Sequence, residues 1–489
     1  MVKLEEHKHE TENSSIEKLP APARAYIPLS QHIGKACVPL VKAGDIVSLG
    51  QKIASAEAHV FAPVHASISG KVIGIQDWPH PVLGRSKVIV IENDGLDKPE
   101  GSGLPSDRPE GHGLASFGQS HRQSHKPEGS GLPSDRQSHR QSHRQEDEIN
   151  NFTPDQIRNI VFEAGIVGMG GASFPAHIKL KPPRQVDTLI INGAECEPYL
   201  TCDYRLMIEK ASQILKGIEL VARCLGVKDI YIAIEDNKPQ AIKAFEAIRD
   251  KPEGNGLPSD RPEGHGLASF GQSHRQSHKR YAISVLKSMY PQGGEKQLIK
   301  NVLKIEVPSG KLPFDIGVVV QNVATVFAVY EAAYLNKPLY ERVVTVSGSC
   351  ITHPKNLLVR IGTPIKELIN FCGLKEEPAK IIIGGPMMGI AQFSDDVAVI
   401  KSTTGIILFS RNEAKVLEEE FCIRCGACVR ECPVNLMPTL INLASRKELW
   451  QEAKKYGVAD CIECGLCNYV CPSHIGLVQA IKRAKLAFK

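Results

Sequence analysis

The chain has 489 residues, a formal net charge of +5 and 42% hydrophobic residues, which predicts three or four globular domains of about 100 to 200 residues each. The most apolar stretch, residues 316–333, is interrupted by Gln321, Asn322 and Thr325, so we expect no membrane span. The small positive excess, without an aromatic-rich basic stripe, argues against nucleic acid as a partner. The polar first ten residues do not resemble a signal peptide, which favours a reducing cytoplasm.

Residues 25–97 are expected to form a small all-β domain, because short β-rich runs alternate with turn signals. The phrases VKAGDIVSLGQKIA and APVHASISGKVIGI resemble the barrel-sandwich fold of lipoyl and biotinyl domains. Those carrier domains need a lysine at a hairpin tip, and none stands between Lys52 and Lys71. We therefore expect a structural or docking module rather than a carrier.

Two nearly identical segments interrupt the chain. Residues 98–126 return at 251–279 with one change, Ser102 to Asn255, and a shortened copy fills 127–144. Near-identity without apolar periodicity is typical of a duplicated insertion and not of a stacking repeat. We expect disordered loops over 98–149 and 251–279, and their scattered histidines do not suggest a metal site.

The central region, residues 150–340, is predicted to be an α/β domain. A helix-like stretch at 154–163 precedes the glycine-rich loop GIVGMGGASFPAHIK at 165–179, and an apolar strand at 188–191 ends in polar residues. Clustered glycines allow a phosphate or a ring to approach the backbone, although an ordinary loop would look similar. Ligands of α/β sheets bind where strands end, but Glu195 alone could equally be a helix cap.

Residues 341–375 are predicted to form a strand, a turn, a second strand and a short helix, within a module that ends near residue 400. Cys350 and Cys372 stand alone in this region. An isolated cysteine is more often a small buried side chain than a metal ligand.

The C-terminal region, 412–489, contains two copies of C-x2-C-x2-C-x3-C-P, offset by 39 residues. This is the bacterial two-cluster ferredoxin pattern, in which the fourth cysteine of each copy binds the other cluster. Zinc sites do not require the third cysteine or the final Cys-Pro. The pattern predicts two [4Fe-4S] clusters, the first bound by Cys422, Cys425, Cys428 and Cys471, and the second by Cys432, Cys461, Cys464 and Cys467. A basic side of the final helix, with Lys482, Arg483 and Lys485, could face a partner or only solvent.

Four motifs in order, GMGGASFPAHIK, INGAECEP, YPQGGEK and QNVAT, resemble the flavin- and NADH-binding core of the NADH-oxidising subunit of respiratory complex I. With a sandwich before them and two clusters after, the chain resembles the RnfC/RsxC family, the C subunits of the Rnf/Rsx ion-translocating electron-transport complex. The resemblance implies a multidomain α/β and α+β fold: barrel-sandwich, Rossmann-like flavin domain, β-grasp module at 341–400 and ferredoxin-like α-helical domain.

The resemblance also implies roles for ten residues outside the cysteine quartets. FMN would be bound by Gly168, Gly170, Gly171, Lys179, Asn192 and Asn322. The nicotinamide side would be lined by Glu195, Glu197 and Glu295, taken as the catalytic residues, and by Tyr290. The complex I pattern has Arg where Met169 stands and an acid where Ala194 stands, and the loss of an Arg weakens phosphate binding.

The implied function is electron exchange between NAD(H) and a ferredoxin-type carrier, coupled in membrane subunits to ion translocation. A flavin accepts two electrons together and releases them singly to clusters. Integral-membrane and iron–sulfur subunits of the same complex are the expected partners, on the cytoplasmic side of the cell inner membrane. Two alternatives are a soluble flavin reductase of the cobalamin-reductase type and a non-catalytic relay or scaffold without flavin.

Overall fold

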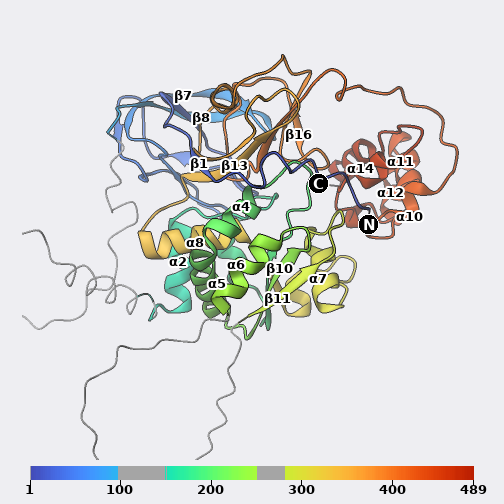
Figure 1. Ribbon diagram of the computed structural model, residues 1–489, viewed down its shortest axis with the longest axis horizontal. Coiled ribbons are helices and arrows are strands. Elements are labelled where there is room, and N and C mark those ends of the chain that lie inside the picture. Colours follow the sequence, from blue (N-terminus) through green and yellow to red (C-terminus); the bar gives the residue numbers. More distant parts are fainter. Residues whose placement is uncertain (1, 97–148, 150, 250–280, 489) are drawn as a thin grey trace, which may run out of the picture.

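The computed structural model describes residues 2–96, 149, 151–249 and 281–488. The N-terminal strands and the third domain lie along one side of the central domain, and the cysteine-rich helices form a separate lobe at one end of the molecule (Figure 1). The predicted insertions at 98–149 and 251–279 fall outside the described residues, between β8 and α2 and between α6 and β11, except Ile149. Ile149 is buried in the core of the central domain, so the first insertion was predicted to end too late.

The N-terminal domain consists of two small antiparallel sheets. Their orders are β2-β8-β7-β4 and β3-β5-β6. The long pair β7 and β8 runs in register from Gly70 opposite Asn93 to His80 opposite Gly84, with one shift near Val72. The inward residues, such as Ile27, Ile53 and Ile89, pack between the sheets. The strands are β2 (Arg24–Pro28), β3 (Val38–Pro39), β4 (Ile46–Val47), β5 (Lys52–Ser55), β6 (Val64–His65), β7 (Gly70–His80) and β8 (Gly84–Asn93).

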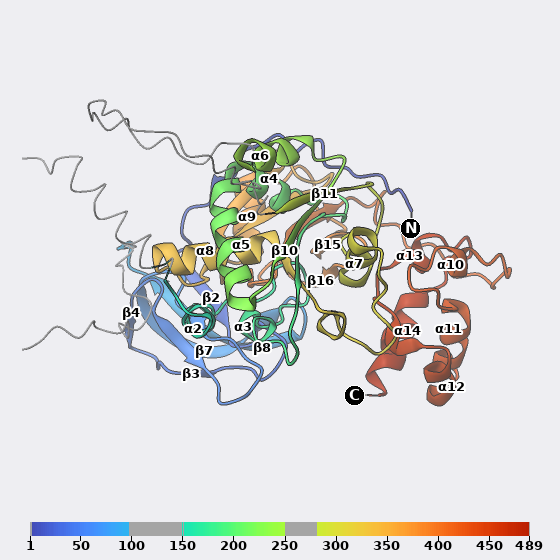
Figure 2. The same ribbon diagram turned by 90° about the horizontal axis from the view of Figure 1, so that it is seen from below.

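The central domain is a parallel four-stranded sheet in the order β11-β10-β9-β12. Successive side chains of β9 alternate between faces: Leu189 and Ile191 pack with helices α2, α5 and α8, whereas Ile190 packs with α7 (Figure 2). The strands are β9 (Thr188–Gly193), β10 (Asp229–Glu235), β11 (Ala282–Leu286) and β12 (Val318–Asn322). The helices are α2 (Pro154–Glu163), α3 (Ala176–Lys179), α4 (Cys202–Glu209), α5 (Ala211–Leu225), α6 (Pro239–Arg249), α7 (Glu295–Leu303), η1 (Pro313–Ile316) and α8 (Val323–Leu335).

The third domain is a mixed six-stranded sheet in the order β1-β14-β13-β17-β15-β16, packed with α9. Cys350 and Cys372 are fully buried in its apolar core, which agrees with their predicted role as small buried residues. Its elements are β1 (Glu17–Lys18), β13 (Glu341–Ser347), β14 (Lys355–Arg360), α9 (Ile365–Cys372), β15 (Lys380–Ile383), β16 (Ile390–Gln392) and β17 (Gly405–Phe409).

Lys401 connects three of these domains at one point. Its side chain is 1% exposed, and its ammonium donates hydrogen bonds to the carbonyl oxygens of Pro63 and Gly165, both at 2.7 Å. Pro63 belongs to the sandwich, and Gly165 begins the glycine-rich loop. The base of that loop is therefore fixed to its neighbours.

The C-terminal domain repeats a short helix followed by a longer one. In each copy a glycine with positive φ, Gly426 or Gly465, precedes the short helix within a cysteine quartet. The helix α11 ends shortly before Glu448, which adopts a φ of 57°, and the short helix α12 begins after it. The elements are α10 (Ala427–Arg430), α11 (Pro438–Arg446), α12 (Trp450–Lys455), η2 (Val458–Asp460), α13 (Leu466–Tyr469) and α14 (Leu477–Leu486).

Residues 2–19 form a segment that we call the strap, with hydrogen-bonded turns between Lys8 and Ser14. It starts beside the C-terminal helices, as both views show (Figures 1 and 2), and ends as β1 in the third domain. Between these points it crosses the edge of the central sheet at which the parallel strands end. The strap thus contacts three of the four domains.

Candidate functional site

The central sheet has a topological switch point between β9 and β12, and we call the sheet edge at this point the crevice. Strand order reverses there, since β10 and β11 lie on one side of β9 and β12 on the other. In open α/β sheets ligands bind at this switch point, beyond the carboxyl ends of the strands. The predicted ligands Asn192 and Asn322 are register partners at these two strand ends. The structure therefore brings them together at the expected place.

Both asparagines are held by hydrogen bonds. The amide of Asn192 donates to the carbonyl of Gly293 at 2.9 Å. Asn322 caps α8 by accepting from the N–H of Ala324, and its amide donates to Asp203 at 2.6 Å. Burial and the nearby charge of Glu195 raise the pKa of Asp203 to about 7. A buried acid that titrates near neutrality thus lies directly behind the crevice.

The glycine-rich loop closes over Asn322. The N–H of Gly168 donates to the carbonyl of Phe174 at 2.8 Å, and a Cβ on Gly170 would lie 3.2 Å from the Asn322 side chain. Gly171 has a φ of 142°, and nothing lies within 4 Å of the position that a Cβ would occupy on its open side. Met169 is buried and apolar, so the position that carries Arg in the resembling pattern supplies no cation here. The glycines of the loop can accept a flat or anionic group through their backbone.

Lys179 and Glu295 form an ion pair beside the crevice. The ammonium lies 2.5 Å from the carboxylate and 3.0 Å from the carbonyl of Val320 in β12. Glu295 is the first residue of α7, where a negative charge is favourable. A phosphate bound here would share the ammonium with this carboxylate.

Glu195 lies just after β9, with a φ of 47°. Its carboxylate accepts hydrogen bonds from the N–H groups of Asp203 at 2.7 Å and Tyr204 at 3.1 Å, so it caps α4. Ligand atoms of Glu195, Cys202 and Asp203 lie within 4.8 Å of one another. Both Glu195 oxygens already accept capping hydrogen bonds, and we assign no metal to this group.

Glu197 and Tyr290 lie where the central domain meets the C-terminal one. The Glu197 carboxylate accepts from the N–H groups of Met387 and Met388 at 3.1 and 2.9 Å. Burial raises its pKa to about 7. The Tyr290 hydroxyl donates to the carbonyl of Cys464 at 2.7 Å, and only 2% of the residue is exposed. Their roles toward a nicotinamide remain predictions.

The cysteines gather in the predicted crossed sets. Cys422, Cys425, Cys428 and Cys471 line one cavity of about 160 Å³. Cys432 packs against the same apolar cluster as Cys461. It also lies near enough to Cys461, Cys464 and Cys467 that a negative charge on its sulfur would raise the pKa of each of these thiols, after the larger effect of burial. Each set offers four thiols, the ligands that a [4Fe-4S] cluster requires. The geometry supports the predicted assignment.

The two sets differ in their surroundings. Cys422 and Cys425 are exposed, whereas Cys464 and Cys467 are each 8% exposed. The second set borders the central domain, because Tyr290 contacts Cys464 and Gln297 donates to the carbonyl of Pro433 at 2.8 Å. The first set lies on the outer side.

The basic side of α14 is engaged within its own domain. Lys485 donates to the carbonyl of Cys461 at 2.9 Å and pairs with Glu463 at 2.7 Å, and Arg483 pairs with Glu448. Lys482 lies 3.9 Å from Glu463. These contacts favour an intramolecular role over docking.

The fold and the site together define a class of electron-transfer protein. It combines an α/β domain of the kind that binds flavin and nucleotides with a two-cluster iron–sulfur domain. Family models match the RnfC barrel sandwich hybrid domain over 2–96, the Nuo51 FMN-binding domain over 161–331, the SLBB domain over 343–391 and the 4Fe-4S dicluster domain over 414–472. The match to an FMN-binding domain and to a 4Fe-4S dicluster domain confirms the predicted cofactors, FMN and two [4Fe-4S] clusters.

The chain belongs to the RnfC family, the C subunits of ion-translocating oxidoreductase complexes, as the resemblance predicted. It is 41% identical to the C subunit of the proton-translocating ferredoxin:NAD(+) oxidoreductase complex of Clostridium ljungdahlii, over 94% of this chain and 87% of the relative. The Na(+)-translocating counterpart of Acetobacterium woodii is 39% identical over 95% and 90%. The C subunit of the ion-translocating oxidoreductase complex of Rhodobacter capsulatus is 41% identical over 98% and 81%.

Among solved structures, an NAD+-reducing [NiFe]-hydrogenase shares 18% identity with a TM-score of 0.45, over 68% of this chain and 60% of that one. This similarity is too low to support a functional conclusion. Within the described part of the chain, no helix combines the length and apolarity needed to span a bilayer.

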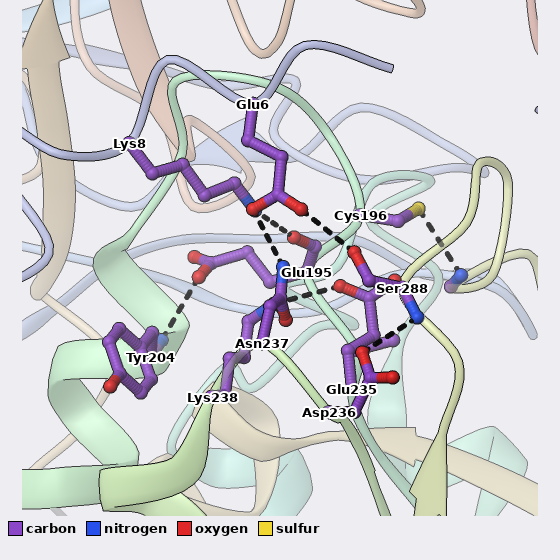
Figure 3. A network of polar contacts seen from close by, with 12 residues as sticks. Glu6, Lys8, Glu195, Cys196, Tyr204, Glu235, Asp236, Asn237, Lys238 and Ser288 are labelled. Atoms are coloured by element: carbon purple, nitrogen blue, oxygen red, sulfur yellow. Dashed lines mark hydrogen bonds and ion pairs between the residues drawn. The ribbon is translucent and has the colours of Figure 1, made fainter. Parts of the chain in front are cut away.

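Several residues near the site were not predicted from the sequence. They are Glu6 and Lys8 of the strap, and Lys238, which pairs with Glu235 at 2.9 Å (Figure 3). Asp203, in contrast, was among the polar residues expected after the strand at 188–191, where ligands of α/β sheets bind. Lys8 is 187 residues from Glu195 in sequence, and nothing in its polar neighbourhood pointed to that contact.

Proposed function

We propose that this chain is the peripheral subunit that exchanges electrons with NAD(H) in a membrane-bound complex, which couples electron transfer between NAD(H) and a ferredoxin-type carrier to ion translocation. The names of the relatives support this proposal. Integral-membrane and iron–sulfur subunits of the same complex are its proposed partners, and the cytoplasmic side of the inner membrane is its proposed location.

The observation that carries the proposal is the contact between the central domain and the second cysteine set. Tyr290 follows β11 on the nucleotide side and donates directly to Cys464. Electron transfer requires donor and acceptor sites to be held close together, and this buried contact fixes them. FMN, when bound, supplies the conversion between hydride and single-electron chemistry.

The residues around the crevice have proposed roles in this scheme. Gly168, Gly170 and Gly171 would bring their backbone against FMN, with Asn192 and Asn322 at its polar edge and Lys179 near its phosphate. Glu195, Glu197, Glu295 and Tyr290 would shape the nicotinamide side. The carboxylates of Glu195 and Glu197 both accept hydrogen bonds from backbone N–H groups. We therefore expect them to hold loops in place rather than to act as free bases.

Anaerobic purification followed by iron, sulfide and FMN assays tests the proposal, with NADH-driven bleaching of the cluster absorbance as the functional readout. Dithionite should bleach the same sample and so report intact clusters. Clusters that bleach with dithionite but not with NADH, in protein reconstituted with FMN, would refute the proposal.

A matched pair of glycine variants adds specificity. Gly170→Val should lose FMN, because its Cβ lies 3.2 Å from Asn322 and the added methyl groups would enter the crevice. Gly74→Val places the same side chain where nothing lies within 4 Å of the Cβ, so it should retain FMN. Equal FMN content in both variants would place the flavin elsewhere.

A further inference from the structure

The strap covers part of the ligand-binding edge of the central sheet. Val2 exchanges backbone hydrogen bonds with Tyr290, and Leu4 packs with Tyr290 and Cys464. The Glu6 carboxylate accepts from Ser288 at 2.8 Å and Asn237 at 2.7 Å, just beyond the ends of β11 and β10 (Figure 3). A nucleotide phosphate placed over those two strands would meet this carboxylate.

Lys8 makes the strap's contact with β9. Its side chain is 6% exposed, and its ammonium donates to the backbone carbonyl of Glu195 at 2.5 Å (Figure 3). Burying an ammonium is unfavourable unless it is well paired. The buried carboxylate of Glu235 is paired with Lys238 at 2.9 Å, and the Lys8 ammonium donates its hydrogen bond to a peptide carbonyl.

The peptide that Lys8 holds is in an unusual conformation. Glu195 has a φ of 47° and Tyr199, four residues later, a φ of 66°, a region that residues other than glycine rarely adopt. Glu195 is fixed at both ends, because Lys8 holds its carbonyl while the first turn of α4 holds its carboxylate. Without Lys8, only the carboxylate end would remain fixed.

The two residues just before Lys8 also contact this loop. The N–H of Tyr199 donates to the Glu6 carbonyl at 2.8 Å, and the His7 ring stacks on Tyr199 at 4.7 Å. Three successive strap residues, Glu6, His7 and Lys8, therefore each contact the loop that contains Glu195 and Tyr199. We propose that Lys8 is a positioning residue for the loop 194–199, and that the strap through Lys8 gives the nucleotide side of the crevice its shape. The effect on NADH rests on the proposed function, whereas the effect on the loop does not.

Three variants test this role: Lys8→Met, Lys8→Arg and, as a matched control, Lys3→Met, which makes the same change at an exposed lysine of the strap. Hydrogen–deuterium exchange reports the loop directly, because the Asp203 and Tyr204 amides donate to Glu195. In Lys8→Met their exchange should accelerate about tenfold, and in Lys3→Met it should not change. Lys8→Arg, which keeps a donor, should restore most of the protection.

Steady-state kinetics gives the second readout. In Lys8→Met, kcat/KM for NADH should fall by about tenfold or more, mainly through KM, while dithionite reduces the clusters as in the wild type. Unchanged exchange in Lys8→Met overturns the proposal, whatever the kinetics. Equal losses of activity and thermal stability in Lys8→Met and Lys8→Arg also overturn it, because they indicate a general folding defect. A wild type that cannot oxidise NADH would refute the proposed function, and the exchange data would still decide the role of Lys8.

Discussion

Replacing Lys401 by Met should change how the stability of the protein depends on pH. Burial lowers the pKa of Lys401 from 10.5 to about 8. Between these two values the unfolded chain keeps a proton that the folded chain has released, so folding stability rises with pH. From pH 7 to pH 9.5 this linkage contributes about 2 kcal/mol to the wild type and nothing to Lys401→Met.

The same substitution also removes two hydrogen bonds. The carbonyls of Pro63 and Gly165 would lose their buried donor, which should lower the free energy of unfolding at pH 7 by about 2 to 4 kcal/mol. The gap between the two proteins should therefore be larger at pH 9.5 than at pH 7.

Urea unfolding at pH 7 and pH 9.5 measures both effects, and the difference between the proteins removes the contribution of other titrating groups. Lys375→Met is the control, because it makes the same change at an exposed lysine of the third domain. If the profiles of wild type and Lys401→Met run parallel over this range, the Lys401 ammonium does not release its proton as argued.

Three further predictions concern the clusters and the glycine-rich loop. Cys471→Ser should damage the cluster headed by Cys422, so the iron content should fall from about eight to about four per chain while the EPR signal of the second cluster remains. Loss of the EPR signal of the second cluster instead would contradict the crossed assignment. Gly165→Ala should destabilise the protein by more than about 1 kcal/mol in chemical unfolding, because φ is 65° and the new Cβ would lie 2.3 Å from the Pro63 carbonyl; an unchanged midpoint would show that the loop relaxes freely. Lys485→Met should make the potential of the second cluster more negative in an EPR redox titration, because a positive charge beside the Cys461 carbonyl is lost; an unchanged potential would limit Lys485 to a structural role.

Local signals predicted much of the fold. The helix at 154–163 agrees with its expected bounds, since Thr153 and Gln156 form a capping box before an amphipathic run. The strand at 188–191 was recognisable because a strand buried on both faces is continuously apolar. The cysteine spacing predicted the ferredoxin-type domain, and the buried state of Cys350 and Cys372 followed from their isolation.

Other features depend on contacts between distant residues. The meeting of Asn192 with Asn322 requires the strand order of the sheet, which no single motif contains. The partners of Lys485 and Arg483 could not be read from the periodicity of one helix. The predicted domain limits, the roles of the crevice residues and the two insertions remain predictions.

The strap also has a consequence for biosynthesis. Leu4 shares an apolar cluster with Cys464, which is synthesised much later because it lies far along the chain. At about 5 to 20 residues per second, the strap waits roughly 20 to 90 seconds for that partner. Domains translated earlier can fold as units during that interval. The strap can therefore complete its packing only after the second cysteine set has been synthesised.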